Sequence, residues 1–207
     1  DAFSLSSLFS FLDLNLSFSF LPHSLVPLRT FREYRNCQRV IIKSTQLSNL
    51  IWRRLFPHFR REDFEFVTPF GFDSEGTWLP SSVNEVMRFI KYDGGGHFRP
   101  HRDGAFARSL DERSIFTILL YLTDIKPGQG TQMIIYKENC VGKKDRWSKI
   151  DPVQSKIEIC PRAGTVVCFL HDLWHEGCPV PSGSVKYVMR TDLMFRRVRG
   201  GFFSSRR

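Results

Sequence analysis

The sequence predicts a mainly β protein whose core is a sandwich or a barrel, with helical structure on its N-terminal side. Two observations indicate this fold class. Six short apolar runs of strand length follow one another from residue 86 onward. Clusters of glycine, proline and aspartate separate these runs, and an amphipathic helix precedes them. Many short strands joined by such turns are typical of sandwiches and barrels.

The helix is predicted to begin next to Ser44, whose hydroxyl is a suitable N-cap. Pro57 limits its extension, because proline cannot continue the helical hydrogen-bond pattern. One helical face gathers the apolar residues Leu47, Leu50, Ile51 and Leu55. Residues 58–84 follow as an irregular or short-strand segment interrupted by glycines and a proline.

The strands are expected where apolar and β-branched residues are concentrated. The predicted ranges are 86–92, 114–122, 131–136, 157–160, 165–170 and 186–195. Turn residues separate several of them, at 126–130, 161–164 and 181–183. The polar stretch 142–151 reads as an exposed loop between strands.

The length of 207 residues suits one domain with a sizeable core. We divide the chain into four parts: an N-terminal segment without a clear pattern (1–30), a helical or irregular support region (31–84), the core (85–197) and a basic tail (198–207). Because the chain begins at Asp1 rather than at methionine, we expect truncation or processing. The first residues lack the basic start of a signal peptide, and Asp13 with many serines argues against a membrane span.

The formal net charge of +9 fits either a solvated basic surface or an acidic partner, including nucleic acid. The five cysteines are odd in number and contain no CxxC pair, which excludes zinc-finger spacing and does not indicate a disulfide framework. Reduced thiols favour an intracellular setting. Nothing in the sequence indicates an oligomeric state.

A cluster of metal-ligand residue types is the main functional signal. His101 and Asp103 are two residues apart, so a strand or strand end places both on one face. A third ligand must come from elsewhere, and the candidates are His175 and His171 after the apolar run at 166–170, with His97 competing upstream. Two imidazoles and one carboxylate hold one face of a metal ion and leave the other open, as in non-haem Fe(II) oxygenases.

Several segments occur in an order that resembles a known family. They are 88–92 followed by glycines and 98–103, then 114–124, then 128–133 with a Gly-rich turn, then 161–164 with the strand leading to 175–180, and finally Gly183 and Lys186. From about Val86 to Phe195, roughly half of the chain, these segments resemble the 2-oxoglutarate- and Fe(II)-dependent dioxygenases. The resemblance is strongest to the prolyl 4-hydroxylase-like branch, of the alpha-subunit catalytic domain type.

This resemblance implies a double-stranded β-helix, a jelly-roll or cupin-like core with helices packed outside. It also implies that His101, Asp103 and His175 bind Fe(II), which favours His175 over His171. The implied cosubstrates are 2-oxoglutarate and O2, with ascorbate as a reductant. The implied reaction hydroxylates a C–H bond and releases succinate and CO2, with the difficult chemistry carried by iron and cosubstrate.

The same resemblance places the cosubstrate. Lys186 and Arg190, eleven and fifteen residues after the distal histidine, compete to bind the far carboxylate of 2-oxoglutarate. The position of Lys186 fits the family better, whereas a guanidinium is chemically better suited to a carboxylate. Tyr121 matches a tyrosine that hydrogen-bonds this carboxylate, and Thr117 shares its strand face. Tyr92 matches a residue that lines the cosubstrate pocket.

Three functional readings follow. The first is hydroxylation of a protein or peptide side chain, with a peptidyl proline as the first candidate, or of a small molecule; it rests on family analogy. The second is oxidative demethylation of nucleic acid, which the positive charge permits. The third is a jelly-roll module that binds a metal without turnover.

Overall fold

In the computed structural model of the chain, the described residues are 32–124, 133–136, 156–159 and 162–198. The predicted N-terminal segment, the turn at 126–130, the polar loop at 142–151 and most of the basic tail lie outside these residues. Within them, no helix is both long and apolar enough to cross a bilayer. The cysteines that can be described, Cys37, Cys168 and Cys178, are free thiols.

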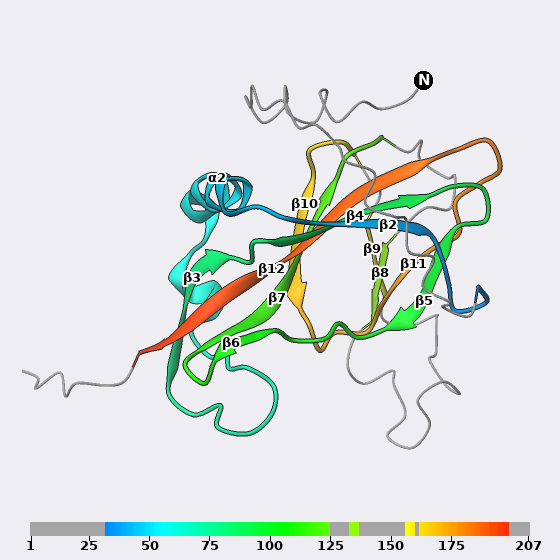
Figure 1. Cartoon of the computed structure of the whole chain (residues 1–207). Helices are drawn as coiled ribbons and strands as arrows, with labels where there is room; N and C mark the ends of the chain where they lie inside the picture. Colours follow the sequence, from blue (N-terminus) through cyan, green and yellow to red (C-terminus); the bar gives the residue numbers. More distant parts are fainter. Residues whose placement is uncertain (1–31, 125–132, 137–155, 160–161, 199–207) are drawn as a thin grey trace, which may run out of the picture.

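Two antiparallel sheets face each other (Figure 1). The larger sheet has the order β10-β7-β12-β4-β2, with β3 paired to β12 and β6 paired to β7. Its strands are β2 (Gln38–Lys43), β3 (Thr77–Val83), β4 (Val86–Tyr92), β6 (Ala107–Ser109), β7 (Glu112–Tyr121), β10 (Val166–Leu170) and β12 (Lys186–Val198). The long strand β12 runs through the middle and pairs with β7, β4 and β3.

The smaller sheet has the order β1-β5-β11-β8-β9. Its strands are β1 (Arg35–Asn36), β5 (His97–His101), β8 (Met133–Tyr136), β9 (Lys156–Ile159) and β11 (His175–Gly177). Only Cys37 separates β1 from β2, so the chain passes from the edge of the smaller sheet directly to the edge of the larger one.

Helix α2 (Thr45–Leu55) covers the outside of the larger sheet, together with the 3-10 turns η1 (Phe56–His58) and η2 (Arg61–Phe64). The Ser44 hydroxyl accepts a hydrogen bond from the Leu47 amide at 3.2 Å, which confirms the predicted cap. Leu47 and Ile51 are buried, as the helical pattern predicts.

Two apolar clusters pack between the layers formed by the helices and the two sheets. The first lies between the helices and the outer face of the larger sheet, and it includes Leu47, Ile51, Phe64, Trp78, Met87, Ile118, Met189, Leu193 and Phe195. The second lies between the two sheets and is smaller, with Ile90, Tyr92, Tyr121, Val180 and Val188 at its centre. The space between the sheets is therefore only partly filled by apolar side chains.

All six predicted strands are present, with ends shifted by no more than three residues. One of the remaining predictions is refined by the structure and one needs correction. The segment 58–84 ends in the seven-residue strand β3. Pro80 of this strand is opposite Phe195, next to a bulge where the register shifts. Proline has no backbone N–H to donate, and at this bulge its absence interrupts no regular hydrogen-bond pairing. The segment before Ser44 forms β1 and β2, which the sequence did not mark as strands.

Candidate active site

Three side chains converge where two neighbouring strands meet. His101 ends β5, His175 begins β11, and the two residues are direct partners in the antiparallel register. Asp103 follows β5 by two residues, and its amide donates to the His171 carbonyl at 2.9 Å. Backbone pairing therefore brings the distal histidine to the HxD pair, from residues more than seventy positions apart in the sequence.

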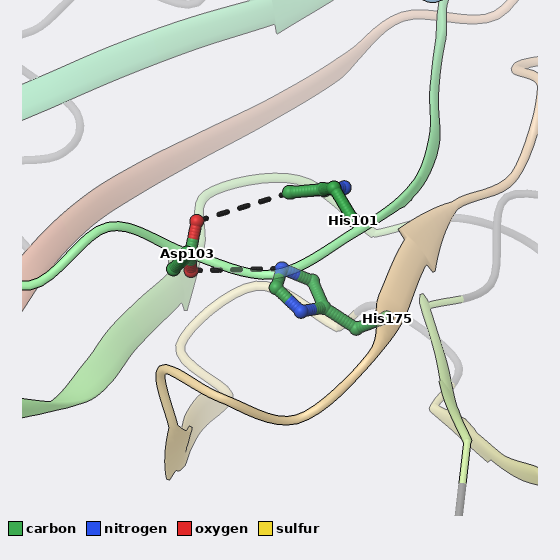
Figure 2. Close-up of side chains that lie close together, drawn as sticks. All are labelled: His101, Asp103 and His175. Carbon is green, nitrogen blue, oxygen red and sulfur yellow. Dashed lines mark ion pairs between the residues drawn. The ribbon is translucent and has the colours of Figure 1, made fainter. Parts of the chain in front are cut away.

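The geometry of this triad suits one cation (Figure 2). Nε2 of His101 lies 3.8 Å from Oδ1 of Asp103, and Nε2 of His175 lies 3.5 Å from Oδ2. The candidate ligand atoms all lie within 4.8 Å of one another. Because all three side chains are about 7% exposed, they lie inside the protein rather than on its surface.

Each imidazole is oriented by a backbone carbonyl. Nδ1 of His101 donates to the Arg99 carbonyl at 2.7 Å, and Nδ1 of His175 donates to the Leu173 carbonyl at 2.9 Å. A carbonyl can only accept, so the proton lies on Nδ1 and the Nε2 lone pair of each ring is available to a metal.

The protonation states match this role. Burial, with the neighbouring His175, lowers the pKa of His101 to about 3, and burial also lowers the pKa of His175. Burial alone would raise the pKa of Asp103, but the charge of Arg190, the imidazoles and a Thr117 hydrogen bond hold it below its usual value. Two neutral imidazoles and one carboxylate are a donor set that fits Fe(II).

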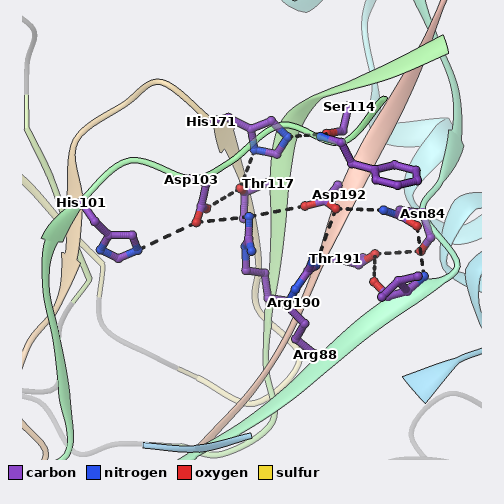
Figure 3. Close-up of polar contacts among 12 residues, drawn as sticks. Asn84, Arg88, His101, Asp103, Ser114, Thr117, His171, Arg190, Thr191 and Asp192 are labelled. Atoms are coloured by element: carbon purple, nitrogen blue, oxygen red, sulfur yellow. Dashed lines mark hydrogen bonds and ion pairs between the residues drawn. The ribbon is translucent and has the colours of Figure 1, made fainter. Parts of the chain in front are cut away.

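A series of hydrogen bonds through Thr117, His171 and Ser114 positions Asp103 (Figure 3). The Thr117 hydroxyl donates to Oδ2 of Asp103 at 2.6 Å, and Nδ1 of His171 lies 2.9 Å from the same hydroxyl. Nε2 of His171 lies 2.8 Å from the Ser114 hydroxyl. Because the Thr117 proton is committed to Asp103, His171 must donate through Nδ1 and accept through Nε2.

The two rival histidines therefore have other partners. His171 orients Thr117 and lies outside the cluster of metal-ligand atoms. Both ring nitrogens of His97 contact backbone carbonyls, those of Gly95 and Glu33. Among the described residues, His175 is the histidine that joins His101 and Asp103.

Arg190 lies between two carboxylates. Its Nη2 is 3.1 Å from Oδ1 of Asp103 and 3.5 Å from Oδ1 of Asp192. Asp192 is 1% exposed, and it also accepts from Asn84 at 3.0 Å and lies 3.6 Å from Arg88. The side chain of Arg190 thus links the metal ligand to a buried charged cluster.

A cavity of about 260 Å³ opens between the sheets beside the triad. Every residue that the sequence assigned to the site lines it: His101, Asp103, His175, Lys186, Arg190, Tyr121, Tyr92 and Thr117. Lys186 is 4% exposed, and its Nζ lies 4.9 Å from the centroid of the Tyr92 ring. Burial lowers the pKa of Lys186 to about 8.

The cavity also has walls that the sequence did not reveal, among them Tyr34, Arg35, Arg39, Arg88 and Phe98. The alternation of Arg88, Ile90 and Tyr92 along β4 is the signal that could have identified Arg88. Arg35 and Arg39 lie in the edge strands β1 and β2, which were not predicted, and Tyr34 immediately precedes β1.

Residues 87–191 match the family model of the 2OG-Fe(II) oxygenase superfamily, and this range contains the triad and both candidate anchors. The chain belongs to this superfamily. Its members are oxidoreductases of the dioxygenase type, and the family implies Fe(II) and 2-oxoglutarate. No curated protein sequence gives a significant match.

Solved structures show the same fold. A Pseudomonas putida prolyl-4-hydroxylase is 20% identical, with a TM-score of 0.52 over 95% of this chain and 85% of that one. A Trichoplax adhaerens prolyl hydroxylase, solved with a hypoxia-inducible factor peptide fragment, is 15% identical, with a TM-score of 0.52 over 93% and 75%. These likenesses confirm the predicted jelly roll with its prolyl hydroxylase-like architecture.

Proposed function

We propose that this oxygenase hydroxylates a C–H bond in a reaction that consumes 2-oxoglutarate and O2 and releases succinate and CO2. The observation that carries the proposal is the position of the triad in one cavity with Lys186 and Tyr121. A metal site and a buried cation within a single cavity suit a cosubstrate that coordinates iron at one end and carries a free carboxylate at the other.

In this proposal, His101, Asp103 and His175 hold Fe(II) through two Nε2 atoms and one carboxylate. Bound iron and 2-oxoglutarate together supply the O2 activation and the oxidising power. Phe98 stacks on His101 with ring centroids 3.4 Å apart, and Phe169 meets His175 edge-on at 4.6 Å. These contacts restrict the orientation of both imidazole rings.

Lys186 is our choice for the anchor of the distal carboxylate. Arg190 lies within 3.5 Å of both Asp103 and Asp192, so its charge is already matched by carboxylates of the protein. Lys186 is buried in the cavity wall, and its lowered pKa indicates an ammonium that a bound carboxylate would stabilise. Tyr121, on the neighbouring strand of the same sheet face, is the candidate hydroxyl donor to that carboxylate.

For the primary substrate, we propose a protein or peptide side chain, with a peptidyl proline first. The support is a prolyl hydroxylase-like fold, which makes this an inference by analogy. Ascorbate is proposed as the reductant that keeps the iron in its ferrous state.

Succinate formation tests the proposal directly. We expect succinate to form only when Fe(II), 2-oxoglutarate, O2 and a suitable substrate are all present, with ascorbate sustaining turnover. Prolyl peptides and methylated oligonucleotides should be assayed side by side. If only the oligonucleotide gave product, nucleic acid would replace peptide as the proposed substrate. If the iron-loaded protein did not turn over 2-oxoglutarate, the protein would be a metal-binding module without this activity.

A further inference from the structure

The cavity wall carries more positive than negative charge. Six cationic side chains line it together with two carboxylates. The cations are Arg35, Arg39, Arg88, Arg102, Lys186 and Arg190, and the carboxylates are Asp103 and Glu176. Nearby carboxylates outside the lining match some of these charges: Asp172 lies 2.6 Å from Arg102, and Asp192 lies within 3.6 Å of Arg88 and Arg190. A confined excess of one charge favours a ligand of the opposite charge.

Three of these arginines form what we call the arginine corner: Arg35, Arg39 and Arg88. Arg39 is paired with Ile90 in the β2–β4 register, so it lies on the same sheet face as Arg88 and diagonal to it. Arg35 is the first residue of β1, and the chain passes through Cys37 to the larger sheet directly after this two-residue strand. The corner is therefore built where the edges of the two sheets come together (Figure 1).

Arg39 has no acidic partner among the residues that the structure describes. Burial and the positive charges of Arg35, Arg88 and Arg190 lower its pKa. Nη1 of Arg88 lies 3.6 Å from Asp192 and Nη2 of Arg190 lies 3.1 Å from Asp103, so carboxylates face both of these donors. Nε of Arg190 is a buried donor without a hydrogen-bond partner in the described part of the chain. Buried donors are nearly always satisfied in folded proteins, so this cavity has at least one donor that a ligand could satisfy.

One aromatic ring separates this corner from the metal ligands. Cζ of Arg35 lies 4.4 Å from the centroid of the Phe98 ring, and His101 stacks on the same ring with centroids 3.4 Å apart. Nε of Arg35 also donates to Sγ of Cys37 at 3.0 Å, which fixes the guanidinium over the ring. An anion in the corner would therefore lie in the same cavity as the triad, next to Phe98.

The corner is separate from the proposed cosubstrate anchor. Lys186 lies on β12 beside Tyr92, whereas Arg39 lies on β2, two strands away across the larger sheet. The anionic groups of 2-oxoglutarate have partners in the metal and Lys186, so the corner remains for a second anion.

We propose that the arginine corner binds an oxyanion of the primary substrate, a carboxylate or a phosphate carried a few bonds from the C–H bond that is oxidised. The inference rests on the proposed function, and it narrows the substrate class to anionic molecules or to peptides with an acidic or phosphorylated residue at the target. Guanidinium groups bind both oxyanions through paired, charge-assisted hydrogen bonds.

The test uses the whole chain loaded with Zn(II), which is redox-inert, and with saturating 2-oxoglutarate. Inorganic phosphate and acetate are titrated separately by calorimetry into the wild type, Arg39→Gln and Arg53→Gln. Arg53 is an exposed arginine of α2 and supplies the same change of charge away from the cavity. The stronger of the two probes identifies the class of oxyanion.

We expect saturable binding of at least one probe to the wild type and to Arg53→Gln, and binding weakened about tenfold or more in Arg39→Gln. The melting temperature of Arg39→Gln should be unchanged or higher, because the variant removes a repelled charge. Equal binding by all three proteins, or no saturable binding to the wild type, would overturn the proposal. It would also fail if Arg39→Gln weakened 2-oxoglutarate binding instead.

Failure of the proposed function gives a different result. If Fe(II) and 2-oxoglutarate produce no succinate with any substrate, the enzymatic proposal fails, while the phosphate and acetate titrations of the metal-free protein still compare Arg39→Gln with Arg53→Gln. A difference between the two variants there would retain the oxyanion site without the reaction.

Discussion

The two faces of strand β12 differ in their chemistry. Residues facing the helices include Met189, Thr191 and Leu193, which are at most 2% exposed and pack into or border the larger apolar cluster. Residues facing the smaller sheet include Lys186 and Arg190, which line the cavity. Because side chains alternate along a strand, one segment can stabilise the fold on one face and carry a charged site on the other.

The largest effect is expected from the triad. We predict that His101→Ala lowers iron-dependent succinate formation at least about a thousandfold, because the iron site loses one of its three protein ligands. His97→Ala is the matched control, since both nitrogens of His97 contact backbone carbonyls. Equal loss in the two variants would show that the substitutions act through folding.

A change on the outer face should have the opposite signature. Leu193→Ala removes a side chain that is 0% exposed, and we expect it to lower the free energy of unfolding by about 2–5 kcal/mol. At temperatures where the variant is folded, its KM for 2-oxoglutarate should match that of the wild type. Urea denaturation and steady-state kinetics measure the two quantities; a raised KM would show that the two faces are coupled.

Two buried threonines sharpen the contrast. Thr117→Val leaves Asp103 and His171 without their shared hydroxyl, so we expect iron affinity to fall about 10–100-fold. Thr191→Val breaks a 2.8 Å hydrogen bond to the Asn84 carbonyl on the other face of the sheet. That control should lose stability with unchanged iron affinity, as measured by metal titration. A similar loss of affinity in both would place the effect in the sheet as a whole.

The smallest effect is a pH dependence of cosubstrate binding. Lys186 has a pKa of about 8 in the free protein, and a bound carboxylate would raise it toward the ordinary value. Below pH 8 the ammonium is already present. Above pH 8, binding must take up a proton, so the Kd for 2-oxoglutarate should rise up to about tenfold per pH unit until the pKa of the complex is reached.

Lys186→Arg should remove this pH dependence, because a guanidinium stays protonated throughout the range. Calorimetry of 2-oxoglutarate binding between pH 7 and pH 9 measures it. A wild-type Kd that stays constant across this range would argue against Lys186 as the anchor and would favour Arg190 in that role.

Sequence reasoning worked best where one strand determines the answer. Alternation placed Lys186 and Arg190 on one face of β12 and Thr117 and Tyr121 on one face of β7, and all four line the cavity. The i, i+2 spacing likewise placed His101 and Asp103 together. These inferences need only the two-residue period of a strand.

Reasoning from sequence was weaker where the answer depends on pairing between distant strands. His175 and His171 are four residues apart and could not be separated by spacing; the β11–β5 register places the first in the triad, while His171 contacts Thr117. Thr117 itself lines the cavity as expected, but its hydroxyl is bonded to Asp103. Arg39 was missed because β2 was not predicted, although Val40, Ile41 and Ile42 form a short β-branched run within it.

The central position of β12 has a consequence for how the chain folds. Among the described strands, β12 is the last in the sequence, yet it pairs with β3, β4 and β7. These three strands therefore cannot complete their pairing until the chain has been synthesised as far as residue 198. Pairings between residues so far apart make folding slow, and the waiting edges are prone to aggregation. The three triad residues all precede β12, so the nascent chain has its metal ligands before it has the wall that encloses them.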